Sequence, residues 1–177
     1  MSWYDECVGL RSVSLRYFNA AGAWFDGSLG EDWSLTPNLV PLTMKAMLGR
    51  RGPLQVFGTD YPTADGTAIR DYVHVVDLAD AHLRSLELLE AGGDSTTLNL
   101  GTGTGSSVFE VLASAERVTG RTVPYEVAPR RSGDPVALYS DGTRAEQRLN
   151  WRARYGLDEI VSSAWDWHSA HPDGFDE

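Results

Sequence analysis

The sequence predicts an α/β fold, in which strands and helices alternate along the chain. A continuous apolar and aromatic run over residues 12–18 (SVSLRYF) is typical of a strand buried on both faces of a parallel sheet. A helix is predicted over 78–91, with Asp77 as its N-cap and a pair of glycines after its last turn. Ser107 and Glu110 have the spacing of a capping box, which predicts the start of a second helix.

The other elements are predicted from apolar periodicity and turn residues. Helices are expected over 1–10, 38–48, 107–120, 141–149 and 157–170. Strands are expected over 54–57, 97–100 and 122–127. The stretches 19–37 and 58–67, rich in Gly and Asp, are expected to be loops, and the second leads into segment 70–76.

Composition limits the classes of function. The chain has 177 residues and a formal net charge of −10. This charge argues against a nucleic-acid partner, but a few arginines in one cleft can still attract an anionic small molecule. The single cysteine, Cys7, excludes a disulfide framework, and no Cys/His spacing indicates a metal site. No apolar run approaches the ~18 residues of a membrane span and the first residues lack signal-peptide character, so we expect a soluble, cytoplasmic protein without a membrane partner.

Two arginine-containing segments are candidate anion sites. Arg70 follows a Gly/Pro loop, and Arg131 follows a predicted strand, with Asp134 close behind it. Guanidinium groups suit a diphosphate because they offer several donors in one plane and keep their charge. From these residues alone, solvated surface ion pairs are the favoured interpretation. The pair Arg50 and Arg51 is interpreted as complementing the dipole at a helix end and facing solvent.

The glycine-rich segment LNLGTGTGSSVFEV also follows a predicted strand and opens a helix. Its spacing, Gly101-x-Gly103-x-Gly105, differs from the G-x-G-x-x-G of dinucleotide-binding turns, and no acidic residue ends a following strand. We therefore interpret it as a tight strand-to-helix turn. The four histidines show no pairing with acids or cysteines at ligand spacing, and we interpret them as structural.

The string GTDYPTADGTAIRDYVHVVDLADAH resembles the corresponding stretch of UDP-glucose 4-epimerases, members of the extended short-chain dehydrogenase/reductase group. The strings LRYFNAAGA, NLVPLTMKAMLGRR, LNLGTGTGSSVFEV, APRRSGDP and AWDWHSAHPDGF agree with it in order. The resemblance implies the C-terminal part of an NAD(P)-binding Rossmann-like fold. Residues 1–177 would be mainly the small substrate-binding domain, with 1–20 and about 72–101 adding elements to the cofactor domain.

The resemblance also implies a bound NAD and a UDP-sugar substrate. Phe18 matches a residue beside the nicotinamide end of NAD. The matching substrate-binding positions are Asn19, Asn38, Leu39, Gln55, Val56, Phe57, Arg70, Tyr72, Arg131, Asp134 and Leu138. Among these, the strand 55–57 is implied to pack against the uracil, and the two arginines are implied to hold the diphosphate. The resemblance thus favours ligand contacts over surface ion pairs.

Leu138 departs from part of the family, because some members carry a bulky tyrosine at this sugar-side position. A smaller residue leaves room, so we hypothesise tolerance of N-acetylated sugars in a complete enzyme. A related UDP-pentose or UDP-N-acetylhexosamine 4-epimerase is therefore an open alternative. A non-catalytic module that binds nucleotide sugars is a second alternative.

The catalytic residues of the family are not found in this sequence. None of the seven tyrosines is followed four residues later by lysine, and Lys45 is the only lysine. The family reaction is inversion at C4 of a UDP-hexose through a 4-keto intermediate, an isomerase activity that uses tightly bound NAD. We therefore expect this chain to be a C-terminal half whose Met1 is an internal methionine. Alone, we expect it to be inactive, free of NAD and marginally stable, whereas the complete enzyme is implied to be a homodimer.

Overall fold

The computed structural model describes residues 2–34 and 36–175 and confirms the α/β class. The helices are α1 (Ser2–Val8), α2 (Leu39–Met47), α3 (Val75–Glu90), α4 (Val108–Thr119), α5 (Thr143–Leu149) and α6 (Leu157–Ala170). The strands are β1 (Val13–Arg16), β2 (Asn19–Ala21), β3 (Leu54–Phe57), β4 (Ile69–Arg70), β5 (Tyr72–His74), β6 (Thr96–Asn99), β7 (Ser106–Ser107), β8 (Tyr125–Ala128) and β9 (Ala137–Leu138).

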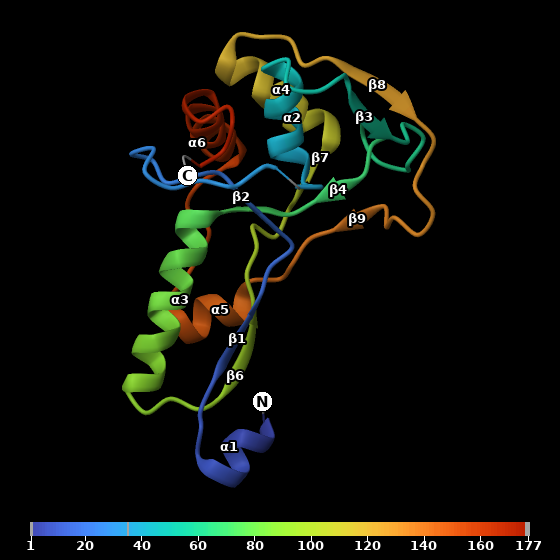
Figure 1. Cartoon of the computed structure of the whole chain (residues 1–177). Coiled ribbons are helices and arrows are strands. Elements are labelled where there is room, and N and C mark those ends of the chain that lie inside the picture. Colours follow the sequence, from blue (N-terminus) through green and yellow to red (C-terminus); the bar gives the residue numbers. More distant parts are fainter. Residues whose placement is uncertain (1, 35, 176–177) are drawn as a thin grey trace.

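The strands form four small sheets (Figure 1). Three of them are parallel pairs, β1 with β6, β2 with β5 and β3 with β8. In the fourth, β4 lies between antiparallel β7 and parallel β9. Parallel pairing over long sequence separations requires crossover connections, and helices α3 and α4 lie in two of these connections.

Two hydrophobic cores lie on either side of the β2–β5 pair (Figure 1). The first core packs helices α2, α4 and α6 around buried residues such as Met44, Val111 and Ile160. The second core packs α3 and α5 against the β1–β6 pair and includes Trp151. Strand β5 joins the cores, because successive residues of a strand point to opposite faces. Its Tyr72 belongs to the first core and its Val73 to the second.

The stretch 19–37 is not all loop as predicted, because its first three residues form β2. The backbone N–H of Asn19 donates to the Asp71 carbonyl at 3.1 Å, and Asn19, Ala20 and Ala21 lie in register with Tyr72–His74. The strand therefore depends on a partner more than 50 residues away, and the local composition of residues 19–21 does not predict it.

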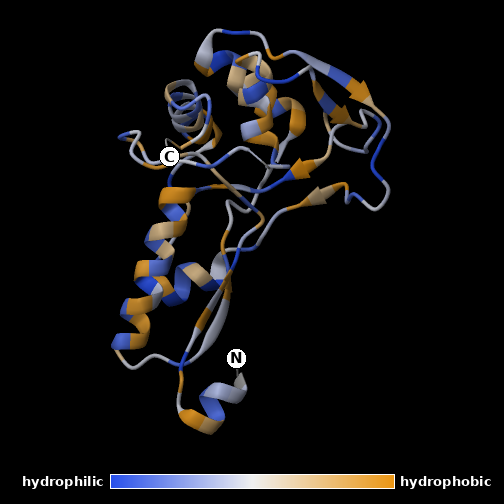
Figure 2. Cartoon of the chain, in the orientation of Figure 1, coloured by the Kyte–Doolittle hydropathy of each residue, from blue (hydrophilic) through white to orange (hydrophobic). Residues whose placement is uncertain are grey.

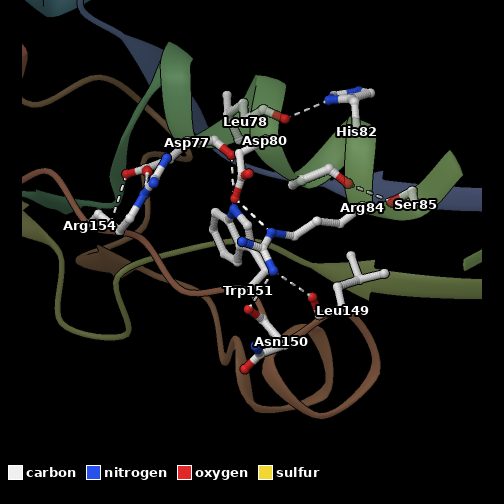
Figure 3. Close-up of polar contacts among 11 residues, drawn as sticks. Asp77, Leu78, Asp80, His82, Arg84, Ser85, Leu149, Asn150, Trp151 and Arg154 are labelled. Carbon is white, nitrogen blue, oxygen red and sulfur yellow. Dashed lines mark hydrogen bonds and ion pairs between the residues drawn. The ribbon is translucent and has the colours of Figure 1, made fainter. Parts of the chain in front are cut away.

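Asp77 is not the N-cap of α3, which begins at Val75. The cap is His74, whose Nδ1 accepts the Val76 N–H at 3.1 Å. The Asp77 carboxylate is fully buried in the first helical turn and accepts from the Arg154 and Tyr155 N–H groups at 2.8 and 3.1 Å (Figure 3). A distant backbone segment thus uses the carboxylate that the sequence pattern assigned to the helix terminus.

Strand β1 is present, but it is not buried on both faces, and Arg16 at its end is exposed. Among the described residues β1 and β6 pair only with each other, so each keeps one free edge. Apolar residues run along α3 (Figure 2), and two of them, Leu83 and Leu86, are exposed at 61% and 58%. The expected apolar face and strand edges are therefore present on this side of the molecule.

His168 makes the stability of the first core dependent on pH. Its ring stacks on Trp33, with the centroids 4.3 Å apart, and its Nδ1 has no hydrogen-bond partner among the described residues. Burial, with the nearby Lys45 charge, lowers its pKa from 6.5 to about 4. At a pH between about 4 and 6.5, His168 binds a proton in the unfolded chain but not in the folded chain. Its contribution to the free energy of unfolding is therefore fully present above pH 6.5 and is lost as the pH falls toward 4.

We expect the free energy of unfolding to fall by about 1 kcal/mol through His168 between about pH 7.5 and about pH 5.5. The His168→Phe variant keeps the stacked ring without a titrating nitrogen, so it should lose less stability over the same interval. Urea unfolding at both pH values measures the difference. His74, whose pKa burial also lowers, accounts for a residual dependence in both proteins. Equal pH dependence in parent and variant would contradict this role.

Within residues 2–34 and 36–175, no helix is both long and apolar enough to cross a membrane. In the same residues, no group of three or more His, Cys, Asp or Glu side chains is placed to hold a metal ion.

Candidate functional site

A cavity of about 290 Å³ opens where β2, α2, β3, β4 and β5 meet the segment 131–134. This volume is close to the lower limit of the ~300–1,000 Å³ typical of small-molecule sites. Its walls combine apolar side chains with a few polar ones. The lining residues are Asn19, Pro37, Asn38, Leu39, Leu42, Arg51, Leu54, Gln55, Val56, Phe57, Ala68, Arg70, Tyr72, Val108, Arg131 and Asp134.

The lining is positively charged although the chain is strongly acidic. Arg51, Arg70 and Arg131 face a single acid, Asp134, in a chain with a net charge of −10. Three guanidinium groups in one cleft set a local field that opposes the net charge. The cavity therefore suits an anionic ligand.

Arg70 is held in one orientation in the wall of the cavity by three contacts. Its Nη1 donates to the carbonyls of Ile69 and Pro135 at 2.7 and 3.0 Å, and its Nη2 lies 3.5 Å from Asp134 Oδ1. Its side chain is only 17% exposed. Because the two carbonyls fix one side of the guanidinium group, little rotamer freedom is left to lose on binding a ligand.

The two neighbouring arginines of the 130–131 pair have different environments. Arg130 Nε donates to Asp60 Oδ1 at 2.6 Å, and its guanidinium group lies 4.0 Å from the Tyr61 ring. Arg131 instead lies 3.8 Å above the Phe57 ring and lines the cavity. Only Arg131 therefore directs its charge and its stacking surface to a ligand.

Strand β3 presents a free backbone edge beside the cavity. The Leu54 and Gly58 N–H groups donate to the carbonyls of Pro124 and Ala128, on the side of β8. By the alternation of a strand, the backbone groups of Gln55 and Phe57 point to the opposite edge, which is unpaired among the described residues. The Val56 side chain is buried in the first core and its backbone groups lie on the side of β8, so Val56 forms part of the wall and the free edge belongs to Gln55 and Phe57.

Three further polar side chains of the lining lie at the starts of three elements. Asn38 precedes α2 without capping it through its side chain, and its Nδ2 lies 3.4 Å from Glu31 Oε1. Asn19 starts β2, and Tyr72 starts β5 directly opposite it. Burial raises the pKa of the Tyr72 phenol well above its ordinary value, so this hydroxyl stays protonated and can donate.

Ten of the twelve predicted binding positions line this one cavity. Phe18 and Leu138 do not line it. Phe18 is 45% exposed between β1 and β2, and Leu138 is in β9, in register with Arg70. The roles assigned to all twelve remain predictions. The lining residues that sequence reasoning missed are Pro37, Leu42, Arg51, Leu54, Ala68 and Val108.

Arg51 is the missed residue with the clearest chemical consequence. The sequence pattern placed it at a helix end and in solvent, but it is only partly exposed and lines the cavity. Gly49, directly after the C-cap Leu48, has a φ of +68° and turns the chain, so Arg51 lies beyond the last turn of α2.

The glycine-rich segment after β6 packs closely against other parts of the protein. A Cβ on Gly101 would lie 2.2 Å from Asp71 Oδ2 and 2.0 Å from Ser140 Oγ, so this glycine accommodates protein atoms. The glycine turn connects β6 to the two-residue strand β7, which leads directly into α4, so the predicted strand-to-helix turn contains one further short strand. Phe18, the position predicted to contact NAD, is 45% exposed.

The parallel strand pairs and the arginine-lined cavity define an α/β protein with a cavity suited to an anionic small molecule. Residues 1–101 match the NAD dependent epimerase/dehydratase family, so the match covers more than half of the chain. This chain belongs to the NAD dependent epimerase/dehydratase family.

Individual relatives agree with this assignment. A UDP-glucose 4-epimerase from Lacticaseibacillus casei is 48% identical over 99% of this chain and 53% of its own length. A crystal structure of a UDP-glucose 4-epimerase is 44% identical, with a TM-score of 0.96 over 99% of this chain and 54% of its own. The enzyme from Bifidobacterium longum in complex with NAD+ and UDP is 40% identical, with a TM-score of 0.90 over 98% of this chain and 52% of its own. The chain spans about half the length of the relatives it matches.

Proposed function

We propose that this chain is the UDP-sugar-binding half of a UDP-glucose 4-epimerase, an isomerase that inverts C4 of a UDP-hexose. The observation that carries the proposal is the convergence of ten predicted positions on one arginine-lined cavity. Similarity to a UDP-glucose 4-epimerase in complex with NAD+ and UDP supports it.

The cavity chemistry suits each part of a uridine diphosphate. The free edge of β3 offers alternating backbone donors and acceptors, which match the donor flanked by two acceptors on the edge of uracil. Arg131 above Phe57 adds a flat cationic surface for the base or a phosphate. Arg70 beside Asp134 provides a charged donor for the diphosphate and an acid that can accept from a ribose hydroxyl.

This half holds the nucleotide, and the redox chemistry belongs elsewhere. NAD supplies hydride exchange at C4 when it is bound in the complete enzyme, which we propose to be a cytoplasmic homodimer. The residues of this chain bind and orient the UDP moiety, and Phe18 would contribute a single ring to the NAD side. In the absence of a Tyr-x-x-x-Lys pair, the isolated chain should bind UDP without epimerising UDP-galactose.

Calorimetry with UDP and with uridine tests the proposal on the chain as it stands. We expect UDP to bind at least about tenfold more tightly than uridine, because each charge-assisted hydrogen bond to the diphosphate contributes about 1.5–3 kcal/mol. A coupled assay with UDP-galactose and NAD+ should show no turnover. Equal affinity for UDP and uridine would contradict the proposal that the arginines hold the diphosphate. Turnover of UDP-galactose by this chain would contradict the proposal that it binds the nucleotide without catalysing the reaction.

A further inference from the structure

Asp71 is a fully buried acid between two cavity residues. Its neighbours Arg70 and Tyr72 line the cavity, whereas Asp71 itself is 0% exposed and points away from it into the protein. An acidic side chain is rarely buried to this extent unless it has several hydrogen-bond donors. The position therefore requires an explanation that the binding site alone does not give.

The donors to Asp71 come from two other chain segments. Asp71 Oδ1 accepts from the Thr102 N–H at 3.0 Å and from its hydroxyl at 2.7 Å. Asp71 Oδ2 accepts from the Ser140 N–H at 3.0 Å. On its other side, the Asp71 carbonyl accepts from the Asn19 N–H at 3.1 Å. One residue thus joins the start of β2, the β4–β5 junction, the glycine turn and the segment after β9.

The glycine turn is shaped around this carboxylate. Gly101 passes so close to Asp71 and Ser140 that a Cβ at this position would overlap both side chains. Ser140 follows β9, whose Leu138 lies in register with Arg70. The Asp71 carboxylate therefore holds Ser140, which lies two residues after Leu138, the β9 partner of Arg70.

We propose that Asp71 is a positioning residue for the diphosphate side of the cavity, an inference that rests on the proposed UDP-binding function. Its carboxylate fixes the backbone on both sides of β4, and its carbonyl fixes Asn19. None of its contacts involves β3 or Phe57, which form the proposed uracil side. Disturbing Asp71 should therefore weaken contacts to phosphate and leave contacts to the base intact.

Asp77 provides a matched control, because it is an equally buried acid six residues later. It accepts from the N–H groups of Arg154 and Tyr155 and from Arg154 Nε at 3.1 Å (Figure 3). None of these residues lines the cavity. Replacing either acid by asparagine turns one acceptor into a donor against neighbouring N–H groups, so both variants should be less stable than the parent.

The test compares UDP and uridine binding to the full 177-residue chain by calorimetry. We expect Asp71→Asn to weaken UDP binding by about tenfold or more and to change uridine binding by no more than about twofold. Asp77→Asn should lower the melting temperature while keeping the parental ratio of the two dissociation constants. A merely structural role of Asp71 would move both ligands together and would leave the two variants alike.

The outcomes separate this inference from the function on which it rests. A parent that binds UDP no better than uridine would overturn the proposed function itself, before any substitution is made. The positioning role would be overturned if folded Asp71→Asn kept the parental preference for UDP over uridine. It would also be overturned if Asp77→Asn lost this preference as much as Asp71→Asn does. If Asp71→Asn fails to fold, Thr102→Val decides, since it removes the hydroxyl donor to Asp71 and a long contact from the exposed Gly105 N–H, while the Thr102 N–H still donates to Asp71. A fall of about threefold in the ratio supports the role, and an unchanged ratio overturns it.

Discussion

The Arg131→Gln variant should bind UDP roughly 10- to 150-fold more weakly than the parent, with no change in fold. The expected loss corresponds to about 1.5–3 kcal/mol for hydrogen bonds to a charged group. The structure explains why the fold should survive. The guanidinium group of Arg131 stacks on Phe57 in the lining of the cavity and forms no ion pair with a described residue.

Arg130 is the natural control for this experiment. It is adjacent in sequence and carries the same charge, but Asp60 and the Tyr61 ring hold its guanidinium group. The Arg130→Gln variant should therefore keep UDP affinity within about twofold of the parent. If both variants lost affinity equally, long-range charge would explain UDP binding better than contact with Arg131. If neither lost affinity, the cavity would not be the UDP site.

The Trp151→Ala variant should lose about 3–5 kcal/mol of the free energy of unfolding, the range for removing a large buried aromatic side chain. Trp151 is 1% exposed in the second core, and its Nε1 donates to the Asp77 carbonyl at 2.8 Å (Figure 3). Nearby, Arg84 Nη1 donates to the carbonyls of Leu149 and Asn150 at 3.2 and 3.0 Å. The indole and this arginine together attach the segment after α5 to α3.

Urea unfolding followed by circular dichroism measures this loss. Folded domains are stable by only about 5–15 kcal/mol, so the substitution should remove a large part of the total or unfold the chain. Trp24→Ala is the control, because Trp24 is 44% exposed and its removal should change stability by less than about 1 kcal/mol. A loss of less than about 1 kcal/mol for Trp151→Ala would contradict a tightly packed second core.

Local signals predicted the elements whose stabilising contacts are local. Strand β3 and helix α6 have the predicted bounds. The Ser107 capping box is present as predicted, because both of its hydrogen bonds close within four residues. A helix terminus or an apolar run whose contacts are local in sequence can be predicted without knowing the rest of the fold.

Long-range contacts account for what the sequence pattern could not reveal. Strand β2 exists through pairing with β5, and the Asp77 carboxylate is taken by Arg154, which lies 77 residues further along the chain. In the site, the motif resemblance indicated ten lining positions, but composition alone favoured solvated arginines. The separation of Arg130 from Arg131 depends on Asp60, 70 residues earlier, which no local pattern contains.

The most direct test of the central claim is a crystal structure of this chain grown with UDP. We expect density for the nucleotide in the cavity lined by Phe57, Arg70 and Arg131, with the uracil along the free edge of β3 and the diphosphate between the two arginines. Well-ordered UDP bound elsewhere on the chain, or a cavity that stays empty at saturating UDP, would contradict the claim that this half of the family fold holds the nucleotide.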